Sequence, residues 1–221
     1  MIEFQAILFD LDGVIIYSED LHAQAKKLTL EKYGIEYPDH LFKDFKGRPD
    51  KVFWNHVSEN LTHGVFPADE LDSHKRKIFL ELSESISIVP GALEFIAKAH
   101  EKFPRMALVT STTEADMMIS EKKFRFLKWF DVVQLGEHTL NHKPHPEPYL
   151  KALSRLGVSA SRALVIEDSP NGVRSARAAG CKVIGITTGF TPSELNAAGT
   201  EYIVAGFNEI ELLIDRVHPD E

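Results

Sequence analysis

Carboxylates, hydroxyl groups and one lysine gather where four short apolar runs of the sequence end. They are Asp10 and Asp12 at the end of the run 4–11, Thr110 and Ser111 at the end of 106–110, Lys143 beyond 131–135, and Glu167 and Asp168 after 163–166. Clustered carboxylates repel one another unless a cation neutralises them, and oxygen ligands without histidine or thiolate indicate Mg²⁺ rather than zinc. Lysine and hydroxyl groups suit phosphate oxygens, and a carboxylate beside bound Mg²⁺ can attack phosphorus to form an aspartyl-phosphate. The set therefore predicts phosphoryl-transfer chemistry.

Each of these groups has a simpler structural explanation when it is taken alone. An Asp-x-Asp pair is usually a turn or a solvated pair, and Lys143 alone is most often a surface lysine. Thr110 can cap the following helix, given Glu114 downstream, and Glu167-Asp168 can cap a helix that begins near Asn171. Their order at the ends of four expected strands is what favours one joint site.

The apolar runs are predicted to be strands of one parallel sheet, because short continuous apolar runs suit strands that are covered on both faces. The expected strands are 4–11, 106–110, 131–135, 163–166, 182–187 and 202–205, and the expected helices among them are 92–103, 146–156, 171–179, 193–198 and 208–217. This alternation predicts a doubly wound, Rossmann-like α/β core. Ligands bind beyond the carboxyl ends of the strands in such a sheet, so the polar groups are expected to meet at one edge.

Residues 18–87 interrupt this alternation. The segment has helical patterns at 22–33, 41–46, 51–61 and 70–85, separated by glycine and proline turn signals, and has no convincing strand. At roughly 70 residues it is about large enough for a small module. The sequence therefore predicts an α/β catalytic core made of 1–17 and 88–221 and an inserted all-helical cap domain made of 18–87. One continuous domain is the alternative that the change of periodicity disfavours.

The polar groups and their surroundings resemble the four ordered motifs of the haloacid dehalogenase superfamily. The matching segments are DLDGV at 10–14, VTS at 109–111, KPHPEPY at 143–149 and IEDSPNGVRSARAAG at 166–180, so the resemblance spans nearly the whole chain. The helical insertion resembles the cap of the subgroup that contains β-phosphoglucomutase and phosphoglycolate phosphatase. Members that dehalogenate lack the second aspartate of the Asp-x-Asp pair, which this chain has.

The resemblance implies a role for each polar group. Asp10 is implied to be the nucleophile and Asp12 the general acid and base, a role commonly worth about 10²–10⁴-fold in rate. The implied phosphate-binding residues are Thr110, Ser111 and Lys143. The implied Mg²⁺ ligands are Asp10, the main-chain carbonyl of Asp12, Asp168 and, in or next to that set, Glu167.

In the subgroup that this chain resembles, residues of the cap determine which substrate is bound. The candidates here are His22, just beyond the expected hinge, and the turn Lys46-Gly47-Arg48, which resembles the substrate-facing loop of β-phosphoglucomutase-like caps. His22 has an equal claim to be an imidazole on the helix surface or partly buried. Tyr17-Ser18 stands where the family often has Asp-Ser or Asp-Thr, and this departure counts against mutase chemistry.

The composition excludes several classes of partner. The 33 Asp and Glu residues exceed the 25 Lys and Arg residues, which gives a formal charge of −8, and such a surface repels nucleic-acid phosphates and anionic lipid. No apolar run approaches the roughly 18 residues of a membrane span. The single cysteine, Cys181, cannot form an internal disulfide. We therefore expect a cytoplasmic protein, a monomer or a weak homodimer, with no nucleic-acid or membrane partner.

Three functions follow from these residues and the resemblance. The first is a Mg²⁺-dependent phosphatase of a small phosphorylated metabolite, either a sugar phosphate or a phosphoglycolate-like acid. The second is a phosphosugar mutase of the β-phosphoglucomutase type, which would return the phosphoryl group to the sugar. The third is a catalytically idle relative that binds a ligand or partner, and the intact set from Asp10 to Asp168 argues against it.

Overall fold

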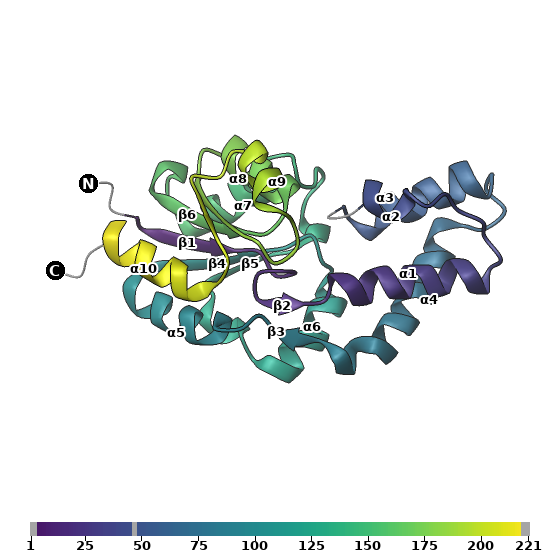
Figure 1. Cartoon of the computed structure of the whole chain (residues 1–221), viewed down its shortest axis with the longest axis horizontal. Coiled ribbons are helices and arrows are strands. Elements are labelled where there is room, and N and C mark those ends of the chain that lie inside the picture. The colour runs from purple at the N-terminus through teal and green to yellow at the C-terminus, as the bar shows by residue number, and fades with distance from the viewer. Residues whose placement is uncertain (1–3, 46–47, 218–221) are drawn as a thin grey trace.

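The computed structural model describes residues 4–45 and 48–217 and arranges them in two lobes (Figure 1). The larger lobe is a sheet with helices on both faces, and the smaller lobe consists of helices. Among the residues described, none of the helices has the length and apolar character needed to cross a bilayer.

The sheet of the larger lobe has six parallel strands. They are β1 (Ala6–Phe9), β4 (Arg105–Val109), β5 (Val132–Gln134), β6 (Ala163–Glu167), β7 (Lys182–Ile186) and β8 (Tyr202–Val204). Their spatial order is β5-β4-β1-β6-β7-β8, and every neighbouring pair is parallel. All six correspond to the predicted strands, so the doubly wound α/β core is confirmed. Because β1 lies between β4 and β6, the residues that follow these three strands meet at the centre of one sheet edge.

The central strand shows why the predicted runs are apolar throughout. Ile7 and Phe9 belong to the apolar cluster on one face of the sheet, whereas Ala6 and Leu8 belong to the cluster on the other face. All four residues are 0% exposed. Alternate side chains of a strand point to opposite faces, so a strand that is covered on both faces needs apolar residues at every position.

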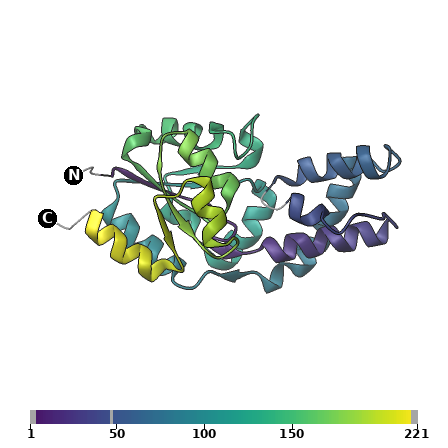
Figure 2. The same ribbon diagram turned by 45° about the horizontal axis from the view of Figure 1, so that its top comes forward.

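Helices cover both faces of the sheet. They are α5 (Ala92–Lys102), α6 (Glu114–Phe124), α7 (Glu147–Leu156), α8 (Pro170–Ala178), α9 (Pro192–Ala198) and α10 (Phe207–Val217). The apolar residues of α5, α6 and α10 pack in one cluster, and those of α7, α8 and α9 pack in the other. Figure 2 shows this division, with the yellow α10 on one side of the sheet and the green helices on the other.

Two of these helices begin immediately beyond the strand ends that carry the candidate residues. At α6 the Thr113 hydroxyl accepts the N–H of Asp116 at 3.3 Å. At α8 the Ser169 hydroxyl accepts the N–H of Gly172 at 3.0 Å, and Pro170 occupies the first turn of the helix. Such caps satisfy N–H groups that have no partner inside a helix, and they fix where the chain leaves the sheet.

The smaller lobe contains α1 (Glu19–Lys32), α2 (Leu41–Asp44), α3 (Asp50–His56), the π-helical turn η1 (Val57–Leu61), α4 (Ala68–Leu82) and the 3₁₀ turn η2 (Ser83–Ser85). It has an apolar cluster of its own, made of Leu30, Ile35, Leu41, Phe53, Trp54, Val57 and Leu71. We call the described residues from α1 to η2 the helical lobe. The helical insertion after the first strand is therefore present, and its predicted boundaries at 18 and 87 stay a prediction.

A two-stranded ribbon joins the lobes. It pairs β2 (Ile16–Tyr17) with β3 (Ser87–Ile88) in antiparallel register, so the chain enters and leaves the helical lobe side by side. The sequence did not predict this ribbon, because two residues per strand are too few to show a period of two. On the returning side, the Lys123 ammonium of α6 donates to the carbonyls of Glu84 at 2.6 Å and Ile86 at 2.9 Å.

Candidate active site

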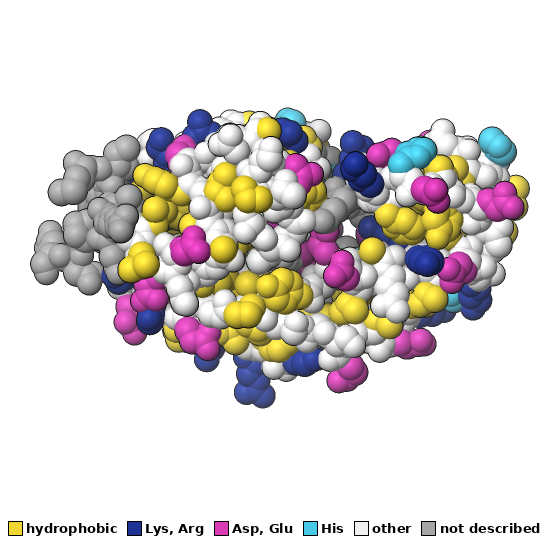
Figure 3. Space-filling model, viewed as in Figure 1, with side chains coloured by type: hydrophobic (Ala, Val, Ile, Leu, Met, Phe, Trp, Pro, Cys, Tyr) yellow, Lys and Arg dark blue, Asp and Glu magenta, His cyan; other side chains and the backbone are white. Residues whose placement is uncertain are grey.

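A cavity of about 410 Å³ lies between the sheet edge and the helical lobe. In Figure 3, acidic and basic side chains gather where the two lobes meet. The predicted residues that line the cavity from the sheet are Asp10, Asp12, Ser111, Lys143 and Asp168, and those that line it from the helical lobe are His22 and Arg48. Lys46 and Gly47 lie outside the described residues. The structure thus brings residues from four strand ends and from the helical lobe to one space.

Asp10 directly follows β1 and is 8% exposed. Its backbone N–H donates to the carbonyl of Ile166 at 3.1 Å, which continues the sheet for one more residue. Its Oδ1 lies 3.0 Å from the Lys143 ammonium. Burial, together with the nearby Glu167 carboxylate, raises the pKa of Asp10 from 3.8 to about 8, although Lys143 acts in the opposite direction. This carboxylate is therefore held at the strand end in surroundings that favour a cation beside it.

Lys143 is held from behind by Glu167, the last residue of β6. The Lys143 ammonium donates to Glu167 Oε1 at 2.6 Å and to the carbonyl of Val109 at 3.0 Å. The Tyr149 hydroxyl donates to the same Oε1 at 2.7 Å, and the Ser169 hydroxyl donates to Oε2 at 3.2 Å. Burial alone would lower the pKa of Lys143, but Asp10 and Glu167 raise it above its ordinary value, so the amine stays charged. Tyr149 was not among the predicted residues, because a tyrosine on an apolar helix face gives no signal of its own.

Asp12 is held by two hydroxyl groups from different parts of the chain. Ser18, beside the ribbon, donates to Asp12 Oδ1, and Thr112 donates to Asp12 Oδ2 at 2.7 Å. Neither hydroxyl was predicted as a partner of Asp12, because they are 6 and 100 residues away along the chain. Gly13 follows with φ at 75°, a left-handed conformation that glycine adopts without strain. This turn directs Asp12 toward the same cavity as Asp10.

Thr110 and Ser111 follow β4 and differ in their surroundings. Thr110 is 2% exposed, and its hydroxyl accepts the N–H of Thr112 at 3.0 Å, so the side chain shapes the turn beyond the strand. Ser111 lines the cavity, whereas Thr110 is not among the residues that line it. Thr110 does not cap α6, since Thr113 occupies that position.

Asp10, Glu167 and Asp168 form a buried group of carboxylates whose ligand atoms lie within 4.8 Å of one another. Burial and the neighbouring Glu167 and Asp10 raise the pKa of Asp168 well above its ordinary value. A Cβ atom would lie 2.1 Å from Asp168 Oδ2 if it were added to Gly13, and 2.2 Å if it were added to Gly189. Any larger residue at either position would therefore displace this carboxylate. An oxygen-only donor set with mutual repulsion fits a hard divalent cation such as Mg²⁺.

On the side of the helical lobe, His22 and Arg48 face the cavity in different ways. The His22 ring stacks on Phe79 with 3.9 Å between ring centroids, and its Nδ1 lies 2.7 Å from the Lys75 ammonium. Burial and this ammonium lower the pKa of His22 from 6.5 to about 4, so the imidazole is neutral at pH 7. The Arg48 guanidinium lies over the ring of Phe45, 5.5 Å from its centroid.

Known proteins resemble this chain in sequence and in fold. The model of the haloacid dehalogenase-like hydrolase family matches residues 7–186. A phosphorylated carbohydrates phosphatase of Thermotoga maritima is 32% identical over 184 residues, which are 81% of this chain and 83% of that protein. Protein CbbY of Rhodobacter capsulatus is 34% identical over 208 residues, 87% of each chain. The crystal structure of CbbY from Rhodobacter sphaeroides in complex with phosphate has a TM-score of 0.82 and 27% identity, and the match covers 94% of this chain and 96% of that one. The chain therefore belongs to the haloacid dehalogenase-like hydrolase family.

Proposed function

We propose that this hydrolase is a Mg²⁺-dependent phosphatase that acts on a small phosphorylated metabolite, and that Asp10 carries the phosphoryl group between two steps. The observation that carries the proposal is the buried Asp10 carboxylate at the sheet edge, 3.0 Å from Lys143 and grouped with Asp168. The names of the relatives support a phosphoric monoester as the substrate, and the phosphorylated carbohydrates phosphatase supports a sugar phosphate. A phosphoglycolate-like acid is the other member of the expected substrate class.

In the first step Asp10 attacks phosphorus and displaces the alcohol. The attacking oxygen is positioned by the end of β1 and by Lys143, whose charge also stabilises the oxygens of the transferring group. Ser111, which lines the cavity, donates to those oxygens, and Thr110 supports the turn that carries Ser111. Glu167 acts through Lys143, because its two oxygens already accept hydrogen bonds from Lys143, Tyr149 and Ser169.

Asp10, the main-chain carbonyl of Asp12 and Asp168 would hold Mg²⁺, with Glu167 beside them. When bound, Mg²⁺ supplies positive charge that offsets both the carboxylates and the phosphate. Excess chelator is therefore expected to abolish activity.

Asp12 transfers the protons in both steps. It protonates the leaving alcohol oxygen first and then accepts a proton from the water that attacks the phospho-aspartate. The hydroxyls of Ser18 and Thr112 hold its two oxygens, so the carboxylate has a fixed orientation before substrate arrives. Ser18 lies beside the ribbon that leads into the helical lobe. Its hydrogen bond to Asp12 therefore links this carboxylate to the segment that joins the two lobes.

The test is release of inorganic phosphate by the purified protein from p-nitrophenyl phosphate and from a panel of sugar phosphates and phosphoglycolate. Asp10→Asn is expected to lower turnover at least about 1000-fold, because an amide cannot act as the nucleophile. The matched control is Glu94→Gln, the same acid-to-amide change at an exposed position of α5 away from the cavity. Turnover by Asp10→Asn at the rate of the control would refute the proposed nucleophile.

The same assay separates hydrolysis from isomerisation. The enzyme is incubated with Mg²⁺ and β-glucose 1-phosphate, with and without a trace of glucose 1,6-bisphosphate, and both phosphate and glucose 6-phosphate are followed. We expect phosphate release to dominate, since water is available once the alcohol leaves. Faster formation of glucose 6-phosphate would make the protein a mutase, and no turnover on any ester would make it an idle relative.

The proposal also covers the cellular location and the oligomeric state of the enzyme. A cytoplasmic location is supported by the single cysteine, which is buried in the structure. A monomer or weak homodimer remains the expected assembly, and size-exclusion chromatography with light scattering measures it directly.

A further inference from the structure

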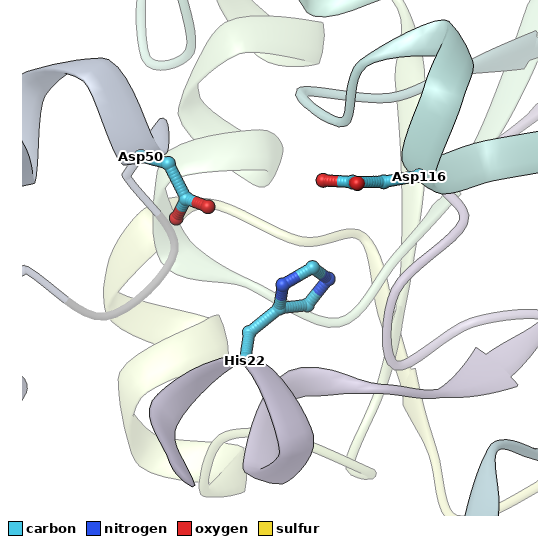
Figure 4. A group of neighbouring side chains, drawn as sticks. All are labelled: His22, Asp50 and Asp116. Carbon is cyan, nitrogen blue, oxygen red and sulfur yellow. The ribbon is translucent and has the colours of Figure 1, made fainter. Parts of the chain in front are cut away.

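Most polar groups around the helical-lobe side of the cavity have partners within the protein. Figure 4 shows the side chains of His22, Asp50 and Asp116 directed toward a common space. The Lys75 ammonium lies 2.6 Å from Asp50 Oδ2 and 2.7 Å from His22 Nδ1. It also lies 4.0 Å from Asp116 Oδ2, and Lys26 pairs with Asp50 at 2.8 Å. These carboxylates and the imidazole are therefore matched by lysines of the chain itself.

Two polar atoms on α3 and α4, which pack against each other, have no such partner. Among the described residues, the buried side-chain atoms without a hydrogen bond are Nε1 of Trp54 on α3 and Oδ1 of Asp72 on α4. Trp54 is 0% exposed, and both residues line the cavity. A buried polar atom without a partner is costly, and a buried indole N–H normally has one. The two atoms therefore indicate a partner that the described residues do not provide.

The two atoms require opposite kinds of partner. The indole N–H of Trp54 is a donor only, whereas a carboxylate oxygen is an acceptor only. Asp72 Oδ2 already accepts from Arg76 Nε at 2.9 Å, which leaves Oδ1 for another donor. A hydroxyl group both donates and accepts, whereas a carboxylate or phosphate anion accepts only and would meet Asp72 with like charge. Hydroxyl groups therefore match this wall of the cavity, and an acid does not.

Aromatic rings line the same part of the cavity. Phe42, Phe45 and Phe53 lie along it together with Trp54, and the rings of Phe42 and Phe53 stack with 5.9 Å between centroids. Binding sites for small molecules commonly combine such apolar surface with a few placed polar groups. This wall thus offers apolar surface to the carbon atoms of a sugar and polar atoms to its hydroxyl groups.

We propose that Asp72 and Trp54 are specificity-determining residues that select a hydroxylated leaving group, such as a sugar, over an acid of the phosphoglycolate type. The proposal rests on the proposed phosphatase function, because it concerns the alcohol that Asp10 displaces. Asp72 accepts a hydrogen bond from one hydroxyl group, and the Trp54 indole donates to another. Both atoms are covered in the structure, and the Asp72 side chain is 22% exposed, so a small rotation of the two side chains brings them to the ligand.

The first test measures binding without turnover. Asp10→Asn is combined with Trp129→Phe, so that Trp54 is the one tryptophan left of the two in the chain. Its fluorescence is followed with Mg²⁺ while glucose 6-phosphate, ribose 5-phosphate, phosphoglycolate or inorganic phosphate is added. We expect both sugar phosphates to shift the emission to longer wavelength, because a hydrogen bond from the indole N–H has that effect. Phosphoglycolate and inorganic phosphate are expected to leave the emission unchanged.

Two results of this titration would overturn the proposal. The absence of a shift with either sugar phosphate would show that the indole N–H has no partner on the ligand, as when a bound water satisfies it throughout. An equal shift with inorganic phosphate would show that the phosphate end alone moves the wall.

The second test exchanges the hydrogen-bonding groups. If the amide oxygen of Asp72→Asn keeps the hydrogen bond with Arg76, its N–H₂ group replaces the free acceptor with a donor. We therefore expect KM to rise about tenfold for glucose 6-phosphate and to fall about threefold for phosphoglycolate. Trp54→Phe keeps an aromatic ring without the N–H, and it is expected to raise KM for glucose 6-phosphate about tenfold. For p-nitrophenyl phosphate, whose leaving group has no further hydroxyl, kcat/KM is expected to change about twofold or less in both variants.

Each variant has a matched control. Glu81→Gln makes the same acid-to-amide change at an exposed position of α4, and Trp129→Phe makes the same aromatic change in the larger lobe. Both controls are expected to leave the KM values within about twofold of the parent. Equal changes of KM for glucose 6-phosphate and phosphoglycolate in Asp72→Asn would contradict the proposal, because a selective contact must affect the two esters differently.

The two proposals fail separately. A protein that releases phosphate from no ester would refute the phosphatase function, and the fluorescence titration, which needs no turnover, would still decide whether Trp54 meets a hydroxylated ligand. An active enzyme in which both variants keep the parent's KM for glucose 6-phosphate would refute the role of Asp72 and Trp54 and leave the phosphatase function standing.

Discussion

Glu167 is fully buried at the end of β6, and its carboxylate oxygens accept hydrogen bonds from Lys143, Tyr149 and Ser169. It therefore contributes to the site by fixing the charged end of Lys143 rather than by facing the cavity. Gly172, in the first turns of α8, makes this arrangement possible. A Cβ atom there would lie 1.8 Å from Glu167 Oε1 and 2.1 Å from Oε2.

Gly172→Ala is expected to lower kcat about 10- to 100-fold, the loss typical when a partner behind an active-site group is displaced. The added methyl group must push the Glu167 carboxylate away, and Lys143 then loses its shortest hydrogen bond. Phosphate release and thermal unfolding of the variant give the two readouts. Gly206→Ala is the control, because nothing lies within 4 Å of a Cβ atom at that position. Equal kcat values for the two variants would contradict the role assigned to Glu167.

At the scale of elements, the helical lobe depends on a small aromatic core. Trp54 is 0% exposed on α3, and its ring meets that of Phe53 edge to face with 4.7 Å between centroids. The π-helical turn η1 continues directly from this helix, so the packing of α3 also fixes the chain that leads to α4. A lobe of this size buries only a few large apolar side chains, so each of them contributes a substantial part of its core.

Trp54→Ala is expected to lower the free energy of unfolding by about 3–5 kcal/mol, the usual cost of a large buried aromatic side chain. Urea denaturation followed by circular dichroism measures this change. Val65→Ala, at a 70% exposed position of the same lobe, is expected to stay within about 0.5 kcal/mol of the parent. A loss of less than about 1 kcal/mol for Trp54→Ala would show that the lobe repacks around the gap.

At the scale of the whole molecule, the two lobes meet through charged side chains, and His22 lies among them. Its pKa is lowered to about 4 by burial and by Lys75, while Asp50 and Asp12 act in the opposite direction and Lys26 adds to the decrease. The unfolded chain binds a proton on this histidine near pH 6.5, whereas the folded protein does not until about pH 4. Stability is therefore lost as the pH falls through this window, by up to about 1.4 kcal/mol per pH unit.

His22→Gln is expected to flatten this dependence, because glutamine does not titrate. The free energy of unfolding is measured with urea at about pH 7.5, 6 and 5, and the parent is expected to lose more stability than the variant between the first and last of these values. The difference between the two proteins cancels the contributions of the other titrating groups. Parallel curves for parent and variant would show that His22 keeps an ordinary pKa in the folded state.

Much of the fold followed from local pattern. Every strand of the large sheet was predicted, because a strand that is covered on both faces must be apolar along its whole length. α6 received no predicted bounds, since buried Asp116 and Ser120 break up its apolar face. The ribbon of β2 and β3 escaped prediction because it is too short to show a pattern.

Part of the candidate site could likewise be predicted from the sequence, and part of it could not. The meeting of Asp10, Asp12, Lys143 and Asp168 at one cavity could be predicted from the sequence, because the ends of parallel strands meet at one edge of the sheet. The partners of these groups could not, since Thr112 is 100 residues from Asp12 and Tyr149 is 18 residues from Glu167 along the chain. A hydrogen bond requires atoms about 3 Å apart, and only the packing of the lobes and helices brings such distant residues that close.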